Sequence, residues 1–231
     1  METLQTVLFV APVLLFSVIA HEYAHGYAAL KQGDPTAQQL GRLTWNPVKH
    51  IDPFLTIIMP LVMGLATNWR IMLGGAKPVP VNPANYRNYR RGDIIVSLAG
   101  VATNFAIAIV STVLLGFLGV IARLAPVTEG TMAVLQVMMI YAILINLMLI
   151  AFNLIPIPPL DGSHVVKHML PPAWAVKYQE WSRFGFLVLL ALLFFGGGLL
   201  QAWMRPAFAL GGILISSVNS FVLPLAWELY R

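Results

Sequence analysis

Residues 4–30 read LQTVLFVAPVLLFSVIAHEYAHGYAAL, and this stretch decides the fold class. A helix needs about 20 mainly apolar residues to cross a bilayer, and this run is longer than that. The rest of the chain has the same character, because 58% of its 231 residues are hydrophobic and only 10% are charged. A soluble domain is about 25% charged. The sequence therefore predicts an all-α polytopic membrane protein.

The other long apolar runs indicate how often the chain crosses the membrane. Five apolar runs are long enough to cross: 4–30, 94–122, 131–155, 183–203 and 207–229. A sixth run, at 54–66, is shorter, so the sequence predicts about five to six transmembrane helices. Pro60 interrupts the short run, which is either one short crossing with an extended return or a re-entrant segment. We expect a single membrane domain over 1–231, with a core of about 1–170 followed by the helices of about 183–229.

The positions of the basic residues indicate an orientation. If the N-terminus is outside, every Lys and Arg except Arg123 and Arg205 falls nominally in the cytosol. Cytosolic loops carry such an excess of Lys and Arg. Arg70 is left open, since it also fits the tip of the excursion that follows 54–66. The prediction is an outside N-terminus and a cytosolic C-terminus.

Composition also excludes several kinds of chemistry. The chain has no cysteine, so disulfides, thiolate metal ligands and thiol nucleophiles are all excluded, and a metal must be held by His, Asp or Glu. The net charge of +5 is explained by the loops, and no nucleic-acid-binding motif appears, so the expected surroundings are a lipid bilayer and not nucleic acid. The first run is long and lacks a basic region before it, so we expect it to be retained and not cleaved as a signal peptide.

The first apolar run contains His21-Glu22-Tyr23-Ala24-His25. A spacing of four residues places both imidazoles on one helix face, where they can share one Zn²⁺ while the intervening Glu serves as a general base. The alternative is a polar histidine pair without metal. His21 lies about 26 Å along the helix from Leu4, still within the hydrocarbon and near its cytosolic side. A carboxylate at that depth needs a cation or a proton, which favours the metal.

A catalytic zinc usually has three protein ligands, so a third is required. Asp161 is the best acidic candidate, because the helix-breaking stretch 156–159 ends an apolar run just before it and can turn it back toward the core. On the assumed topology two acids face the wrong side, Glu2 and Glu129, and three resemble ordinary loop acids, Asp34, Asp52 and Asp93. His164 is the next candidate for a local role. The histidines outside the apolar runs are expected to be interfacial loop residues: His50, His164 and His168.

Residues 76–83, Ala-Lys-Pro-Val-Pro-Val-Asn-Pro, predict extended chain, because proline disfavours helix in the residue before it. Non-helical backbone at membrane depth is tolerated only where it is buried in protein or lines a cavity. We therefore expect this segment to border a water-filled site. A plain surface loop is the alternative.

Two motifs together resemble a known family. HEYAH in a membrane helix, followed far downstream by Asn153-Leu154-Ile155-Pro156-Ile157-Pro158-Pro159-Leu160-Asp161-Gly162, is similar to the site-2 protease family of intramembrane zinc metalloproteases. Residues 76–83 resemble a segment of its compact bacterial and archaeal members. The resemblance covers about residues 8–170 and is weak over the last two helices. Neither a PDZ nor a CBS domain is present.

The resemblance implies that His21, His25 and Asp161 bind one Zn²⁺ per chain and that Glu22 is the general base. It also implies a role for Asn153 in positioning the substrate or the aspartate. Asn104 matches an Asn of the family, although Val101 stands where the family often has Pro. For Asn104, and for Asn146, an interhelical hydrogen bond is the alternative.

The function that the resemblance implies is hydrolysis of a peptide bond in or near the transmembrane segment of single-pass membrane proteins, as in regulated intramembrane proteolysis. Such a substrate must unwind before attack, and an extended segment of this chain can pair with the unwound strand. The candidate residues for this pairing are Lys77, Pro78, Val79, Pro80 and Val81. The expected location is a prokaryotic cell membrane, with the active site toward the cytosol and homo-oligomerisation left open. The rival readings are a metal-ion transporter and a non-catalytic metal-binding membrane protein.

Overall fold

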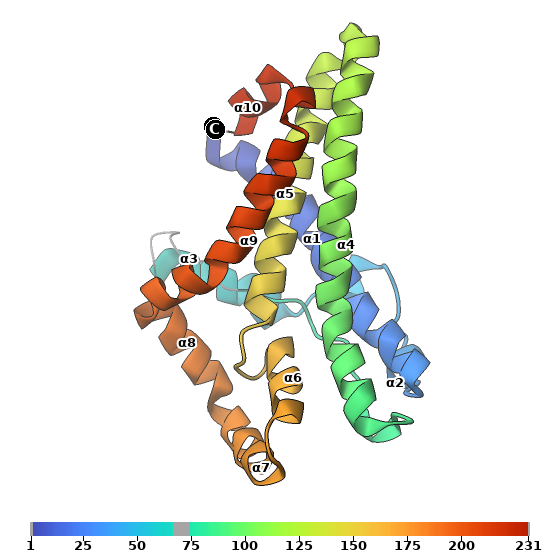
Figure 1. Ribbon diagram of the computed structural model, residues 1–231, viewed down its shortest axis with the longest axis vertical. Helices are drawn as coiled ribbons and strands as arrows, with labels where there is room; N and C mark the ends of the chain where they lie inside the picture. The colour runs from blue at the N-terminus through green and yellow to red at the C-terminus, as the bar shows by residue number, and fades with distance from the viewer. Residues whose placement is uncertain (1, 67–73, 231) are drawn as a thin grey trace. The chain divides into compact units, whose positions relative to one another are not determined.

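The computed structural model describes residues 2–66 and 74–230, and the regular elements in these ranges are all helices. The all-α prediction is confirmed for this part of the chain (Figure 1). The α-helices are α1 (Glu2–Gln32), α2 (Thr36–Gln39), α3 (Met59–Ala66), α4 (Tyr89–Leu124), α5 (Glu129–Asn153), α6 (Asp161–Met169), α7 (Pro172–Trp181), α8 (Gly185–Phe195), α9 (Gly197–Ser217) and α10 (Pro224–Tyr230).

Within the described residues, four helical stretches are long and apolar enough to cross a membrane: Gln5–Gln32, Tyr89–Leu124, Pro126–Asn153 and Gly197–Ser217. The first three match the runs predicted at 4–30, 94–122 and 131–155. The predicted total of five to six is not confirmed by these described helices. α8 has 11 residues, and at about 1.5 Å per residue it is too short for a hydrocarbon core of about 30 Å.

The predicted helix boundaries after residue 183 are wrong. Hydropathy suggested breaks around Pro206, but α9 runs through Pro206, and the chain breaks at Gly196 and again over 218–223. Proline is tolerated inside membrane helices, because neighbouring groups satisfy the carbonyl that it frees. The stretch 156–183, expected as a loop, contains α6 and α7.

The short apolar run at 54–66 is helical. It consists of a π-helix over Pro53–Ile58 followed directly by α3, so the change of helix type falls next to Pro60. Asp52 caps the N-terminus of the π-helix, because its carboxylate accepts hydrogen bonds from the N–H groups of Phe54 and Leu55, both at 2.9 Å. Arg70 and Arg231, both used for the orientation, lie outside the described residues. A short crossing and a re-entrant segment therefore stay alternatives.

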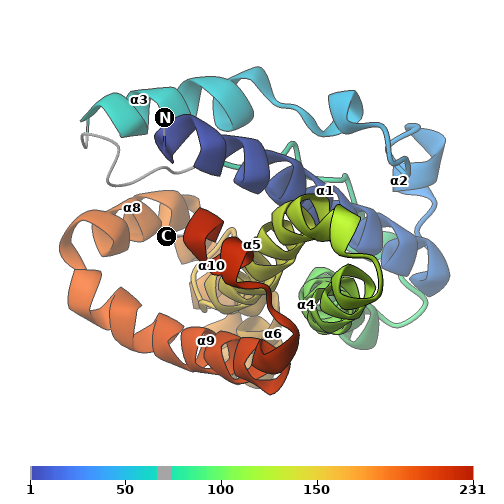
Figure 2. The ribbon, with the colours of Figure 1, turned by 90° about the horizontal axis from the view of Figure 1, so that it is seen from above.

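The chain forms two compact units, one of residues 1–17 with 101–231 and one of residues 18–100. In the first unit α5 is central, and α9 packs along it (Figure 2). Ile140, Ile143 and Leu147 of α5 are buried against Ala108 and Leu115 of α4, and residues of α9 cover the same cluster. Two helices contribute to both units, since α1 and α4 each continue through a boundary between them.

The first unit places the N-terminal part of α1 and the C-terminal helix at one end. Phe9 packs on the cluster formed by Ala122, Ala133, Leu223 and Ala226, which also joins the end of α4 to the start of α5. Leu229 and Tyr230 of α10 pack on the same cluster as Phe9.

A buried amide locks this end of the unit. Gln136 of α5 is fully buried and donates to the carbonyls of Leu115 at 3.0 Å and Phe221 at 2.9 Å, while its Oε1 accepts the N–H of Leu223 at 2.9 Å. One side chain thus ties α4 and the 219–223 turn to α5. The amide replaces water for backbone groups that would otherwise be buried without partners.

We expect Gln136→Leu to destabilise the protein by about 2–4 kcal/mol, because three hydrogen bonds are lost and buried backbone groups are left unpaired. Thermal unfolding in detergent micelles measures the change. Gln201→Leu is the matched control, because Gln201 is exposed on α9. Equal melting temperatures for the two variants would contradict the structural role of Gln136.

Candidate metal centre

The two histidines of HEYAH lie on one face of α1, as the spacing predicts. Their Nε2 atoms are 2.9 Å apart, and their rings meet edge to face with centroids 4.6 Å apart. His21 is buried and His25 is half-buried. Two ring nitrogens of one helix therefore converge on a single point.

A backbone carbonyl fixes the tautomer of His25. Its Nδ1 lies 2.7 Å from the carbonyl oxygen of Val96 on α4. A carbonyl can only accept, so Nδ1 carries the proton and Nε2 presents a lone pair. Histidines that bind metals are commonly oriented in this way by a carbonyl or carboxylate on the other ring nitrogen. The local sequence did not reveal Val96 as this partner.

Gly100 of α4 lets the backbone of that helix lie against the His21 ring. A Cβ placed on Gly100 would be only 2.6 Å from both Nδ1 and Nε2 of His21. Only a glycine fits such an approach without a shift of the ring or the helix. This contact between Gly100 and His21 is not visible in the local sequence and is a finding of the structure.

The carboxylate of Glu22 is held by the extended segment. Its Oε2 accepts the backbone N–H of Val79 at 2.7 Å. Val79 itself is buried, with 6% of its surface exposed. Residues 74–82 have no regular secondary structure, and at Val79 this segment contacts the carboxylate. Lys77, Pro78, Val79, Pro80 and Val81 thus belong to the same unit as the histidines.

Asp161 is the first residue of α6, in the other unit. The chain folds back sharply between α5 and α6, and a Cβ on Gly162 would overlap the carbonyl of Leu154. The predicted helix break at 156–159 is therefore real and places Asp161 at the start of a returning helix. His164 and His168 also lie on α6 and not in a loop.

Asn104, Asn146 and Asn153, all in the first unit, differ in their hydrogen-bond partners. Asn146 makes the interhelical bond that was the alternative for it, donating to Ser17 Oγ at 2.8 Å. Asn153 donates to Leu149 O of its own helix at 2.9 Å. Asn104 is fully buried, and within the described chain neither Oδ1 nor Nδ2 has a hydrogen-bond partner. A buried amide without partners is costly, and the interhelical hydrogen bond that was the alternative for Asn104 is not formed among the described residues.

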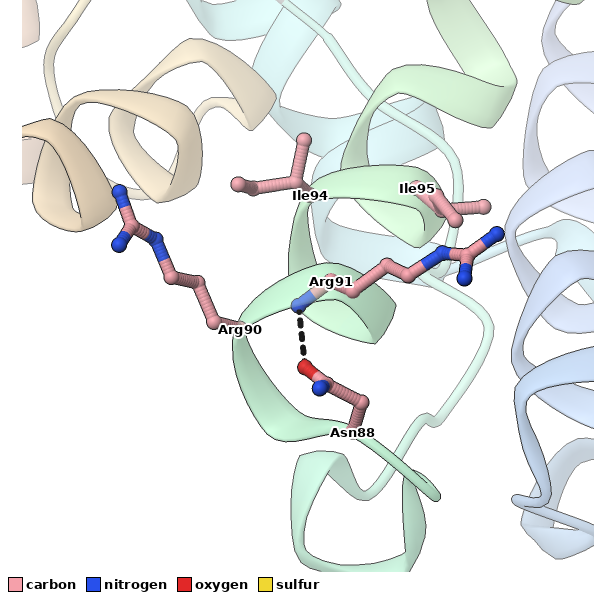
Figure 3. Close-up of a pocket in the computed structure, with 5 residues that line it drawn as sticks. All are labelled: Asn88, Arg90, Arg91, Ile94 and Ile95. Atoms are coloured by element: carbon pink, nitrogen blue, oxygen red, sulfur yellow. Dashed lines mark hydrogen bonds between the residues drawn. The ribbon is translucent and has the colours of Figure 1, made fainter.

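A shallow hollow of about 420 Å³ at the start of α4 lies apart from these residues (Figure 3). It is lined by Asn88, Arg90, Arg91, Ile94 and Ile95. Asn88 caps the helix by accepting the N–H of Arg91 at 3.0 Å, and the two arginine side chains point to opposite sides. The hollow holds no candidate metal ligand.

A helix of membrane-crossing length that carries two converging imidazoles and an intervening carboxylate defines a class, the membrane-embedded metalloproteases of the HExxH type. Comparison with known proteins agrees with this class. Residues 9–195 match peptidase family M50, and the chain belongs to that family. It is the site-2 protease family that the two motifs resemble, and its zinc is implied for this chain.

Several relatives share most of the chain. A Bacillus subtilis protein named "Putative zinc metalloprotease YwhC" is 38% identical over 181 residues, which are 78% of this chain and 77% of the relative. The "Putative zinc metalloprotease Rip2" of Mycolicibacterium smegmatis is 29% identical over 179 residues, 78% of this chain and 64% of the relative. Its Mycobacterium tuberculosis (H37Rv) namesake is 28% identical and covered to 63%. No solved structure matches the chain.

Proposed function

We propose that this protein is an intramembrane zinc endopeptidase that cuts single-pass membrane proteins in or near their transmembrane segments. The observation that carries the proposal is the set of groups on α1. Two imidazole nitrogens lie 2.9 Å apart and the carboxylate between them in sequence is held by a backbone N–H. This arrangement lies in a helix of membrane-crossing length and composition.

The residues fit zinc. With Zn–N distances of about 2.05 Å and a tetrahedral angle, two imidazole nitrogens are about 3.3 Å apart. The observed 2.9 Å needs only a small opening of the pair. The tautomer of His25 supplies a lone pair at Nε2. In a chain without cysteine the third ligand must be a His or a carboxylate, and Asp161 is the residue that we propose, with one Zn²⁺ per chain.

The proposed chemistry divides between the ion and the protein. When bound, zinc supplies a Lewis acid that polarises the scissile carbonyl and acidifies the attacking water. Glu22 accepts the proton of that water through Oε1, since Oε2 already accepts the Val79 N–H. Glu22 then returns the proton to the leaving nitrogen. The Val96 carbonyl keeps His25 in the ligand tautomer throughout.

Asn104 and Asn153 are proposed to contact the substrate. An unwound transmembrane segment brings backbone groups into a place without water, and they need polar partners there. The buried Asn104 amide has both a donor and an acceptor to offer, and Asn153 retains its Oδ1 while its Nδ2 donates to Leu149 O.

The orientation that we propose has the N-terminus outside and the active site toward the cytosol of a prokaryotic cell. Basic residues are numerous in the segments that follow α1 and α5, which is typical of cytosolic segments, whereas Arg123 lies at the other end of α4. Lipid and a single-pass substrate are the proposed partners.

Glu22→Gln tests the proposal against a metal transporter. Purified protein in liposomes is incubated with a single-pass substrate, and cleavage is followed by mass spectrometry. We expect Glu22→Gln to lower cleavage by about 10²–10⁴-fold, the usual contribution of a general base, while zinc stays bound. A zinc chelator should also stop cleavage by the wild type.

Glu180→Gln is the matched control, because Glu180 is an exposed carboxylate on α7. Normal cleavage by Glu22→Gln would overturn the mechanism. Zinc movement across liposomes without any cleavage by the wild type would instead favour the transporter.

A further inference from the structure

Residues 77–82 are anchored to the protein at both ends. Pro78 and Pro80 have no N–H, so the segment has four backbone donors. At its start the Lys77 N–H donates to the carbonyl of His50 at 2.8 Å. At its end the Asn82 N–H donates to Oδ2 of Asp34 at 2.6 Å. These two bonds set the position of everything between them.

Arg42 also fixes the start of the segment, by donating hydrogen bonds to its backbone carbonyls. Its Nη2 donates to the carbonyl of Lys77 at 2.9 Å and to that of Pro78 at 3.3 Å. A guanidinium that donates to two successive carbonyls restricts both the position and the direction of the strand.

Asp34 holds the second anchor. It is fully buried, and besides Asn82 it accepts the Thr36 hydroxyl at 2.5 Å and the Asn85 side-chain amide at 2.7 Å. Burial alone would raise the pKa of Asp34, but the bonds from Asn82, Thr36 and Asn85 outweigh it and hold the pKa below its usual value. The anchor is therefore an ionised acceptor at neutral pH.

The middle of the segment, at Val79, packs closely against α1. A Cβ on Gly26 would lie 2.8 Å from Cγ1 of Val79, so glycine is what lets Val79 approach the helix one residue after His25. This approach brings the Val79 N–H to 2.7 Å from Oε2 of Glu22. Of the four donors, only that of Val81 is then left without a described role.

We infer that residues 77–82 form a base-positioning strap, in which Arg42 and Asp34 are positioning residues that act on Glu22 through the Val79 N–H. The bond occupies Oε2 and so presents Oε1 to the attacking water. The effect of the strap on catalysis rests on the proposed function. The contacts that define the strap all lie within one compact unit and do not depend on that function. It differs from pairing with the substrate, for which the strap has few donors to spare.

The kinetic test compares two replacements of the same residue. Val79→Pro removes the N–H that Glu22 accepts, and Val79→Ala shortens the side chain but keeps that N–H. A hydrogen bond to a charged group is worth about 1.5–3 kcal/mol, or about 10- to 100-fold in rate. We expect kcat of Val79→Pro to be lower than that of Val79→Ala by this factor, with similar KM and zinc content. Equal kcat values, or a rise in KM without a fall in kcat, would overturn the strap.

A measurement without turnover separates the strap from the proposed function. In protein labelled with ¹⁵N-valine, the amide exchange rates of Val79 and Val81 are compared between wild type and Glu22→Ala. We expect Val79 to exchange at least about tenfold faster in the variant, with Val81 changed little. An unchanged Val79 rate would refute the bond. If the wild type cleaves no substrate, the proposed function fails, and the exchange rates still decide whether the strap holds Glu22.

Discussion

Replacing Asp161 by Asn is expected to remove most of the bound zinc and, with it, peptide hydrolysis. The two histidines are neutral ligands, so the dication at this membrane depth depends on carboxylates for charge compensation. Asparagine keeps the size of the side chain and loses the charge. Loss of an outer-shell partner of a metal ligand already costs about 10–100-fold in affinity. For a ligand itself we expect at least about 100-fold, measured as zinc per chain at a buffered free zinc concentration.

The control for this variant is Glu180→Gln, which neutralises an exposed carboxylate of the same unit. Melting temperatures of both variants in the presence of chelator show whether the fold is intact. Wild-type zinc content in Asp161→Asn would mean that the third ligand is another residue. His164, three residues along α6, would then be the next to replace.

The membrane helices differ in how far the sequence could predict them. Polar or proline-containing segments flank α4 and α5 and follow α1, so hydropathy located each of these helices to within about five residues. From residue 183 onward the chain is apolar almost throughout, and its helix ends depend on Gly196 and on packing of the 219–223 turn against Gln136. Hydropathy does not detect such ends. α6 and α7 were missed because they are short and follow a stretch of prolines.

In the candidate site, too, the local features could be predicted from the sequence and the contacts between distant residues could not. The spacing of His21 and His25 is a local property of one helix, and it predicted their convergence. The groups that hold the site come from distant positions: Val96 fixes His25, Val79 binds Glu22, and Asp34 anchors the strap. Asp34 looked like an ordinary loop acid because no local pattern marks an acceptor for Asn82. Only the folded chain brings these partners together.

Gly100→Ala is expected to have the second large effect, through a single methyl group. The added Cβ would lie 2.6 Å from both ring nitrogens of His21, inside the van der Waals contact distance. The backbone of α4 is held in a long helix, so the ring must turn, and its Nε2 then leaves the position 2.9 Å from that of His25. A misplaced ligand weakens the site as a missing one does. We expect zinc affinity to fall at least about tenfold and cleavage to fall with it.

Gly116→Ala is the matched control in the same helix, because there the nearest atom to the new Cβ is a Val218 methyl at 3.4 Å. Alanine is favoured over glycine in a helix by about 1 kcal/mol, so this variant should be at least as stable as the wild type and bind zinc normally. The pair separates helix propensity, which both changes share, from the contact with His21, which only one of them makes. Wild-type zinc affinity in Gly100→Ala would show that the His21 ring has room to move without leaving the metal. The close approach of α4 would then be a matter of packing and not of ligand placement.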